Sequence, residues 1–568
     1  MKRWLGFLVC GIFGLGLLIC GLLVPAHLRA VEGSVLQRAG GNTPSLVEQG
    51  LALVNDRRLG AAQSFQEAAQ AEKLPGEEQL RQALTRSARQ HPDWLVWGGD
   101  PDLERLFGPG PRQPEPLTDF MVEQTNRDLA LQFLRDSSQP AVKELLQTRA
   151  LTRTVLFPPS QSAAGQAFDT AVSVCGLLSA QGHLAAGLGG TNLLALVARA
   201  NRGESSRPLE QMLMDLMSLG RRFNWDQLAA FVSRIPDPVV LRQLADQARN
   251  AGGQLPVLFS SVVLSGRPAA VANYLADFPK TGLRDLAASL QYGAGGLSQL
   301  LRSDCRLDQS RFWRLVTAYN PFGAFYYFAA DYCYRLPAWA LAAKWLFYLL
   351  SGFLLAAALH FVRPAVSSLE RPLQVRGFHV AREVLFALGF LLVVLLLSEP
   401  FLAQERQKEE VPLRLHLPTA GAVIPAGFVR AHPSFMNNLI LLTLLLFFVL
   451  QGLIYVACLV KLAEIRRQRV PPRMKLKLLE NEEHLFDAGL YLGFVGTIVS
   501  LILVSLGVIK FSLMAAYSST SFGIIFVCVF KIFHLRPARR RLLLEAEAES
   551  GRPETLEPGV APTFATPS

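Results

Sequence analysis

Hydroxyl side chains near the carboxyl end are the residues of this chain most suited to chemistry. Residues 493–531 read GFVGTIVSLILVSLGVIKFSLMAAYSSTSFGIIFVCVFK, a stretch apolar enough to lie in lipid. It holds Thr497 and then four consecutive hydroxyl residues, Ser518, Ser519, Thr520 and Ser521. A helical hydroxyl can bond its own backbone four residues back, which satisfies it without any function. The functional alternative is a polar seam that guides water or protons, or receives a partner's ionisable side chain.

Glycines on the first arm of this hairpin predict close helix packing. Gly489, Gly493 and Gly496 lie four and three residues apart, on one helical face, and Gly523 follows the hydroxyl run on the second arm. Small residues on such a face let membrane helices approach closely. Successive helical residues point in different directions, so only one or two of the run can share a face with Thr497. The candidates for lining a channel are Thr497, Ser518 and Thr520.

These residues carry a family resemblance. YLGFVGTIVSLI followed by LMAAYSSTSFGIIFVCVFK resembles the paired signatures of the MotA/TolQ/ExbB proton-channel family. In that family a Gly-Thr-Val type motif lies in one membrane helix, and an Ala-Leu-x-x-Thr-x-x-Gly type motif opens the next. Thr497 matches the first motif, and Thr520 with Gly523 matches the second. The chain departs from the family in its short segment 461–487 and in Val527–Val529, which replaces a proline-rich ending.

The resemblance implies a homo-oligomeric channel subunit, pentameric in the family. It also implies a small single-span partner whose membrane helix carries a protonated Asp, while Thr497 and Thr520 supply hydroxyl-lined walls. The resemblance thus assigns the membrane carboxylate to the partner. The carboxylates of this chain agree with that assignment, because Glu399 and Asp487 are expected at helix ends, where exposure costs little. Lys344, one turn inside another apolar run, is expected to extend its amine outward to the interface.

Composition places these residues in a membrane protein. The chain of 568 residues is 51% hydrophobic and only 18% charged, whereas soluble domains are about a quarter charged. Runs of about 20 apolar residues are long enough to cross the hydrocarbon core. The sequence contains six, Trp4–Val24, Trp339–Val362, Val384–Leu402, Met436–Val460, Ala488–Val508 and Phe511–Phe530.

Charge around these runs predicts their orientation. The segments 363–383 and 461–487 and the start of the tail are rich in Arg and Lys, and basic loops face the cytoplasm. Both termini are then cytoplasmic and residues 25–338 extracytoplasmic, as in a multi-pass protein of a bacterial-type inner membrane. The first run is read as an uncleaved anchor, with a cleaved signal as the alternative. The net charge of +11 therefore indicates contact with anionic membrane lipid, and no basic and aromatic stripe suggests nucleic acid.

The extracytoplasmic part is predicted to be helical and solenoid-like. Residues 46–76 read as a helix pair, with Gly50 at a close approach and a stripe of Ala61, Phe65, Ala68 and Ala69. The pair resembles one tetratricopeptide-type repeat, and an ordinary amphipathic hairpin is the alternative. Further helices separated by glycine and proline breaks suit stacked helix pairs. Such a domain is expected to bind a protein ligand.

Motifs of enzymes and metal sites are absent from the sequence. There is no HExxH, no CxxC and no GxSxG in a strand–turn–helix context, and the glycine-rich residues 182–192 lack the Lys-Ser/Thr of a phosphate loop. The nine histidines are isolated. We therefore expect no enzymatic activity, no cofactor and no metal. The sequence leaves open whether Cys305 and Cys333 pair.

The expected organisation is an all-α polytopic membrane protein. Its parts are 1–24 (anchor or signal), 25–338 (extracytoplasmic helical domain), 339–402 (helix pair), 403–435 (outer loop), 436–535 (three-helix channel-like unit) and 536–568 (basic, then disordered tail). The expected function is a proton-channel subunit coupled to an extracytoplasmic protein-binding domain. The alternative is a membrane-anchored scaffold without transport.

Overall fold

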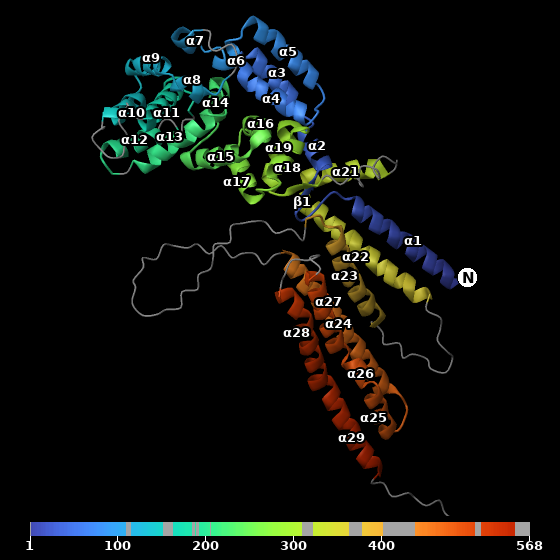
Figure 1. The fold of residues 1–568 in the computed structure, drawn as a ribbon. Helices are drawn as coiled ribbons and strands as arrows, with labels where there is room; N and C mark the ends of the chain where they lie inside the picture. The colour runs from blue at the N-terminus through green and yellow to red at the C-terminus, as the bar shows by residue number, and fades with distance from the viewer. Residues whose placement is uncertain are drawn as a thin grey trace, which may run out of the picture. The chain divides into compact units, whose positions relative to one another are not determined.

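The computed structural model is helical, with two short strands in the part that it describes (Figure 1). That part comprises residues 2–108, 115–150, 163–184, 188, 192–204, 206–308, 322–362, 378–401, 438–505 and 513–550. The expectations for the outer loop 403–435, the turn at 509–510 and the tail 551–568 lie outside it. The chain divides into two compact units, which are described separately. One spans residues 25–337, and the other contains 1–24 and the helices after residue 338.

The first unit, called here the helical unit, contains short helices. Its amino-terminal elements are β1 (Ala30–Glu32), α2 (Gly33–Gly40), α3 (Leu46–Asn55), α4 (Leu59–Ala71), α5 (Glu77–Gln90), α6 (Trp94–Trp97), α7 (Pro101–Phe107), α8 (Leu117–Val122), α9 (Gln124–Arg135), α10 (Pro140–Ala150) and α11 (Ala163–Ala180). The later elements are α12 (Leu193–Asn201), α13 (Arg207–Gly220), α14 (Trp225–Val232), α15 (Pro238–Asn250), η2 (Gly252–Gln254), α16 (Leu255–Ser265), α17 (Pro268–Asp277), α18 (Gly282–Leu290), α19 (Gly293–Ser303), β2 (Arg306–Asp308) and α21 (Phe322–Arg335).

The expected helix pair at residues 46–76 is formed by α3 and α4. Ser45 caps α3 in a capping box with Glu48, which satisfies two backbone N–H groups at the helix start. Gly50 lies at a close approach, because a methyl group there would come within 2.7 Å of the Leu80 side chain on α5. The apolar stripe on α4 is fully buried, through Ala61, Phe65, Ala68 and Ala69.

Packing within the helical unit differs from that of a simple solenoid. In a solenoid each repeat contacts only its neighbours. Here α4 packs against α14 and α16, and Phe65 stacks edge-on against Phe259 at 6.2 Å between ring centroids. One continuous hydrophobic core joins residues from Leu36 to Leu307. The amino-terminal helices therefore share a core with helices far along the chain, because their apolar faces are too wide for one neighbour to cover.

Two short strands join the beginning and the end of the helical unit. β1 pairs in parallel with β2, Ala30 opposite Arg306. The pairing is reinforced by side chains, since the Tyr326 hydroxyl bonds Glu32 and the Arg306 guanidinium lies 3.4 Å from the Asp285 carboxylate. The sequence analysis predicted no strands here, because three-residue strands carry no readable alternation of apolar and polar residues.

The second unit, called here the membrane unit, contains the long apolar helices. They are α1 (Lys2–Leu23), α22 (Pro337–Val362), α23 (Phe378–Ser398), α24 (Asn438–Arg467), α25 (Pro472–Asn481), α26 (Glu483–Phe486), α27 (Ala488–Ser505), α28 (Leu513–Phe530), the π-helix η3 (Lys531–Leu535) and α29 (Arg536–Ser550).

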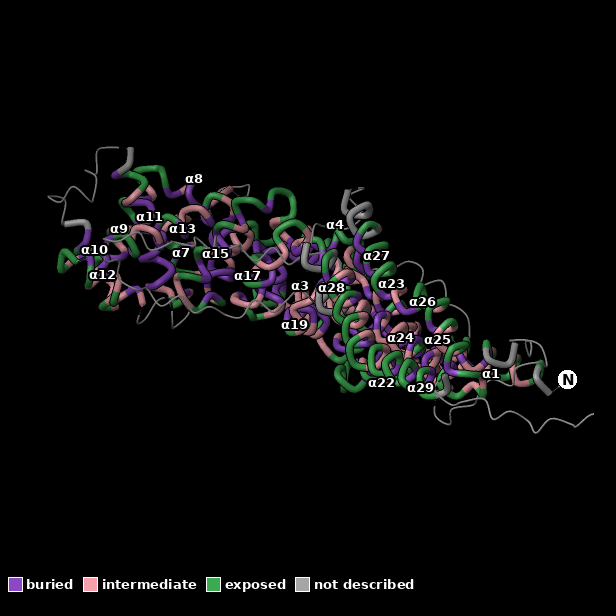
Figure 2. The backbone as a smooth tube through the Cα atoms, turned by 90° about the horizontal axis from the view of Figure 1, so that it is seen from below, coloured by how far each residue is buried: buried purple, intermediate pink, exposed green. Residues whose placement is uncertain are grey.

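Four helical segments among the described residues are long and apolar enough to cross a membrane. They are Trp4–Leu23, Pro337–Leu359, Phe447–Arg467 and Tyr517–Ala548. The other two predicted spans fall on α23 and α27, which contribute the shorter apolar segments Phe386–Ser398 and Ala488–Ile498. Helices of the membrane unit carry exposed residues along their length (Figure 2). Large apolar side chains are among them, including Trp4, Leu397, Phe494 and Ile525. Such a surface is suited to lipid.

Three helices of the membrane unit pack through small residues. Ser351 of α22 donates a hydrogen bond to the Gly14 carbonyl of α1 at 2.7 Å. A methyl group at Gly21 would come within 2.7 Å of the Tyr348 ring. On its other side, α22 places Gly352 against Ala387 of α23. Small side chains thus allow the helices to approach closely, as membrane helices do.

Lys344 is not exposed at the membrane interface, and the expectation that it extends outward is wrong. Its amine lies 3.4 Å from a carboxylate oxygen of Glu399, and the two side chains are 1% and 0% exposed. Glu399 is likewise buried, although it was expected to be exposed at a helix end. The reason is electrostatic: each charge provides the other with a partner, which makes burial less costly than for an isolated ion.

The basic start of the tail forms a helix that packs on the preceding connector. α29 contacts α25, and Arg539 lies 3.3 Å from Glu480. Apolar side chains fill the space between them, namely Leu462, Ile465, Leu479, Phe486, Phe530, Ala538 and Leu542. At this end of the membrane unit α24, α25, α26, the end of α28 and α29 share a small apolar core.

Candidate functional site

The predicted glycine face forms the contact between α27 and α28. The helices run antiparallel, since Gly489 meets Gly523 while Thr497 meets Thr520. A methyl group added at Gly493 would lie 2.8 Å from the Ser519 carbonyl oxygen. One added at Gly523 would lie 2.7 Å from the Gly489 carbonyl oxygen. Backbone against backbone contact of this kind leaves no room for a larger residue.

The two threonines singled out in the sequence lie together. Thr497 Oγ1 and Thr520 Oγ1 are 2.6 Å apart, so one hydroxyl donates to the other. Each also lies 3.2 Å from the Gly493 carbonyl oxygen, to which both can donate. The group contains two hydroxyls and one backbone carbonyl in a buried helix interface. It can pass a proton along hydrogen bonds or hold two helices in register.

The remaining hydroxyls of the run point in different directions. Ser518 and Ser519 are buried, and Ser519 faces Gly496, where its hydroxyl fills the space that a methyl group would need. Ser521 is exposed and donates to the Tyr517 carbonyl of its own helix at 2.9 Å. Thr520 is therefore a member of the run that meets Thr497.

Gln451 of α24 extends this polar contact to a third helix. Its side-chain nitrogen donates to the Gly489 carbonyl at 2.9 Å. Its side-chain oxygen is buried and accepts no hydrogen bond. A buried acceptor without a donor costs about 1–3 kcal/mol, so the interface contains an open hydrogen-bonding position.

Two further polar pairs lie at the end of the same interface. Lys531 forms an ion pair with Asp487 at 2.7 Å, which joins the end of α28 to the start of α27. Tyr455 of α24 lies 2.9 Å from the His534 ring nitrogen. His534 belongs to the π-helix η3, and π-helical turns are frequent at functional sites.

The polar seam, as we name it, consists of Thr497, Thr520, Gln451 and the pairs Asp487–Lys531 and Tyr455–His534. From Thr497 to Asp487 it follows ten residues of helix, about 15 Å at 1.5 Å per residue. Its two terminal pairs were missed as a site in the sequence, where Asp487 was noted only at a helix end. The signal that could have found them is the antiparallel register, which pairs Asp487 with Lys531 once Thr497 pairs with Thr520.

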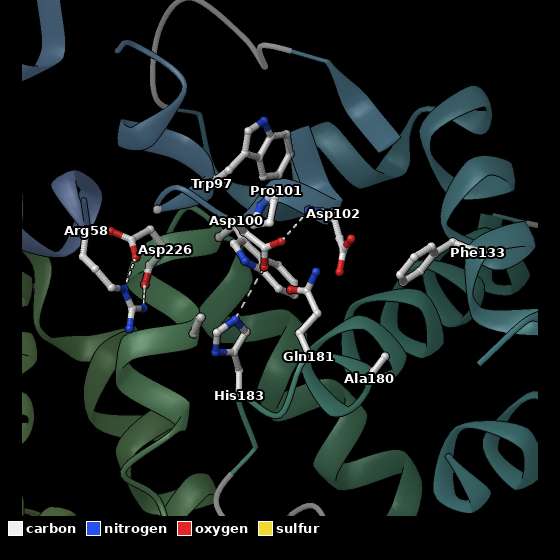
Figure 3. Close-up of a pocket in the computed structure, with 13 residues that line it drawn as sticks. Arg58, Trp97, Asp100, Pro101, Asp102, Phe133, Ala180, Gln181, His183 and Asp226 are labelled. Atoms are coloured by element: carbon white, nitrogen blue, oxygen red, sulfur yellow. Dashed lines mark hydrogen bonds and ion pairs between the residues drawn. The ribbon is translucent and has the colours of Figure 1, made fainter. Parts of the chain in front are cut away.

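A second polar feature is a cavity in the helical unit (Figure 3). Its volume is about 350 Å³, and it lies among residues from α6, α7, α9, α11 and α14 and from the segments before α4 and after α11. Arg58 and Asp226 form an ion pair on one wall at 2.6 Å, and Asp226 also accepts the Ala61 N–H at 2.8 Å. On the opposite side Asp100 caps α7.

The sequence analysis gave no indication of this cavity. Its residues are distant along the chain, as Arg58 and Asp226 are separated by 168 positions. No local motif links them, and the histidine at the site, His183, was read as isolated. Its ring nitrogen lies 3.9 Å from the Asp100 carboxylate.

No group of three or more His, Cys, Asp and Glu side chains suited to a metal ion occurs among the described residues. Comparison with family models, curated proteins and solved structures finds no match to this chain.

Proposed function

We propose that this chain is a membrane-embedded subunit of a proton-conducting complex, of the MotA/TolQ/ExbB type that its motifs resemble. In this proposal α24, α27 and α28 form the wall of the path, and Thr497 and Thr520 are its central hydroxyls. The helical unit lies on the extracytoplasmic side of a bacterial-type inner membrane and binds a protein. Several copies surround a small single-span partner whose membrane helix carries an Asp.

The observation that supports transport is the polar seam within an apolar helix bundle. Polar side chains in a membrane are costly and are usually retained for function. Here seven polar side chains, with the unsatisfied acceptor Gln451 Oε1 among their atoms, follow a single three-helix interface. Hydroxyls, an amide and an imidazole can each exchange a proton or hold a water.

A second candidate is a membrane-anchored scaffold that moves no ion. The observation favouring it is that Thr497 and Thr520 bond each other and the Gly493 carbonyl. Hydroxyls satisfied in this way are sufficient to fix the register of α27 and α28 without conducting anything. The two candidates share the fold and differ in whether protons cross.

Replacing the threonines by valine distinguishes them. Thr497→Val and Thr520→Val keep the shape and remove the hydroxyls, while Ser521→Ala is the matched control on an exposed hydroxyl of the same helix. The complex is purified with whatever co-purifies, placed in liposomes, and proton uptake is followed with a pH-sensitive dye under a membrane potential.

The channel proposal expects the double variant to assemble normally and to lose at least nine-tenths of the proton flux, about one tenfold step or more in rate. The Ser521→Ala variant should keep the wild-type flux. Equal proton flux in all three proteins would show that Thr497 and Thr520 do not line the path. A wild-type flux no greater than that of protein-free liposomes contradicts transport and favours the scaffold. The mass of the complex in detergent measures its copy number and reveals whether a small subunit is present.

A further inference from the structure

We infer that the cavity of the helical unit is a binding site for an extended peptide segment that carries a lysine or arginine side chain. The inference rests on the proposed protein-binding role of this unit and names the chemistry of what is bound. It is independent of proton transport, because every residue of the cavity belongs to the helical unit.

The first argument is an amide with no partner. Gln181 lies directly after α11 and points toward Asp100 and Asp102 in Figure 3. Both polar atoms of its side chain are buried, and neither makes a hydrogen bond. A glutamine amide offers two donors and an acceptor. A peptide group, which has one N–H and one C=O, satisfies both atoms at once.

The second argument is charge. Three carboxylates and one guanidinium line the cavity. Asp226 neutralises the charge of Arg58. The Asp226 carboxylate is buried and accepts hydrogen bonds from Arg58 and from the Ala61 N–H. Asp100 caps α7 and lies 3.9 Å from His183, and Asp102 lies 4.0 Å from the exposed Arg105. Both carboxylates thus have only distant cationic partners, so this end of the cavity is acidic. Carboxylates bind ammonium and guanidinium groups through short, strong hydrogen bonds.

The third argument is the form of the walls. Trp97, Phe133 and Trp225 contribute aromatic rings, and the ring of His183 lies edge-on to Trp225 at 5.8 Å. Aromatic faces hold the apolar stem of a long side chain and attract its cationic end. Ligand pockets of about 300–1,000 Å³ combine apolar walls with a few polar groups in this way. A volume of about 350 Å³ accommodates one side chain with its adjoining peptide group.

The test measures binding of short peptides to the full-length protein in detergent. The probes are acetyl-Gly-Lys-Gly-amide and its analogues with Gln or Glu at the centre, and N-acetylglucosamine represents a sugar ligand. Binding is read from the fluorescence of the tryptophans, two of which line the cavity, and from calorimetry. The variants are Asp102→Asn and Gln181→Leu, with Asp128→Asn as the control, because Asp128 is exposed and lies outside the cavity.

The inference expects the lysine peptide to bind at least tenfold more tightly than the glutamine peptide, and the glutamate peptide to bind least. Asp102→Asn should weaken the lysine peptide about tenfold and leave the glutamine peptide unchanged, while Gln181→Leu should weaken both. Asp128→Asn should change neither. Absence of peptide binding, preference for the sugar, or equal effects of Asp102→Asn and Asp128→Asn overturns the inference.

Failure of this inference can be separated from failure of the protein-binding role. A protein partner that stays bound to the Asp102→Asn and Gln181→Leu variants as tightly as to wild type contradicts the cavity site and leaves the proposed function standing.

Discussion

Two glycines of the same helix face differ in what a methyl group would meet. At Gly493 the nearest atoms are backbone, the Ser519 carbonyl oxygen at 2.8 Å and the Thr520 Cα at 3.2 Å. At Gly496 the nearest atom is the Ser519 hydroxyl, which belongs to a side chain. Overpacking of this kind typically costs about 1–3 kcal/mol. The two positions should therefore respond differently to a compensating change.

We expect Gly493→Ala and Gly496→Ala each to destabilise the membrane unit by about 1–3 kcal/mol. Ser519→Ala should rescue Gly496→Ala, because it removes the colliding hydroxyl, and should not rescue Gly493→Ala. Gly452→Ala in α24 is the control, since nothing lies within 4 Å of its added methyl group. Unfolding in SDS titrations measures the stability. Equal rescue of both glycine variants would contradict the packing described for this face.

Lys344 and Glu399 form the most deeply buried ion pair between side chains of the membrane unit's described residues. Removing one partner leaves an uncompensated buried charge, which costs about 3–5 kcal/mol, whereas removing both costs much less. We expect Lys344→Met and Glu399→Gln each to lower stability strongly, and the double variant to regain most of the loss. The exposed pair Arg541–Glu545 is the control, because its loss should cost less than about 1 kcal/mol. A double variant as unstable as the singles would refute this account.

At the scale of elements, α13 contains a carboxylate whose burial predicts a pH effect. Burial raises the pKa of Asp215 above its ordinary value, and Gln211 and Arg249 only partly offset it. One carboxylate oxygen has no hydrogen-bond partner. Arg242 and Asp246 of α15 are the other charged groups that act on it. Because the folded state binds this proton more tightly than the unfolded chain does, stability falls as pH rises from about 3.8 through the raised pKa.

Asp215→Asn removes that titration. We expect the free energy of unfolding of the variant, relative to wild type, to be greater at pH 7 than at pH 4, by up to about 1.4 kcal/mol for each unit by which the pKa is raised. Its thermal midpoint relative to wild type should be correspondingly higher at pH 7. Asp128→Asn, at an exposed position, should show no such difference. Circular dichroism during heating measures both. A midpoint difference that stays the same at the two pH values would show that burial does not control this carboxylate.

The elements themselves were partly readable from the sequence. Periodic apolar faces predicted the helices, and the glycine spacing predicted the face on which α27 meets α28. The bonds of Gln451 to the Gly489 carbonyl and of Tyr455 to His534 depend on how the helices pack. The strands β1 and β2 were not readable, because three residues carry no period and their partners lie at opposite ends of the helical unit.

At the scale of the whole molecule, contacts between distant segments are the features that the sequence did not predict. Lys344 alone in an apolar run suggests an amine that reaches the interface, and only the fold brings Glu399, 55 positions away, to its side. The cavity likewise forms only where the fold brings Arg58, Asp100, His183 and Asp226 together. No local sequence pattern predicts that they meet. Helices long and apolar enough to cross a membrane were readable, because that property depends on composition and run length alone.

The proposed orientation has a direct test. Single cysteines at Glu72 and Glu547, both exposed, are introduced into a chain whose seven native cysteines are replaced. An impermeant maleimide added to intact cells should label position 72 and not position 547, and detergent should make both reactive. Labelling of position 547 alone would place the helical unit in the cytoplasm.

The parallel pairing of β1 with β2 has a mechanical consequence. The chain enters the helical unit beside β1 and leaves it after β2, so a pull between these two points acts along the strands in opposite directions. The pairing of β1 with β2 and the Asp285–Arg306 contact must then break before tension reaches the helices between the two strands, whereas α21, which follows β2 and bonds Glu32 through Tyr326, is loaded directly. The helices between β1 and β2 can therefore stay folded while the unit bears load between its two ends.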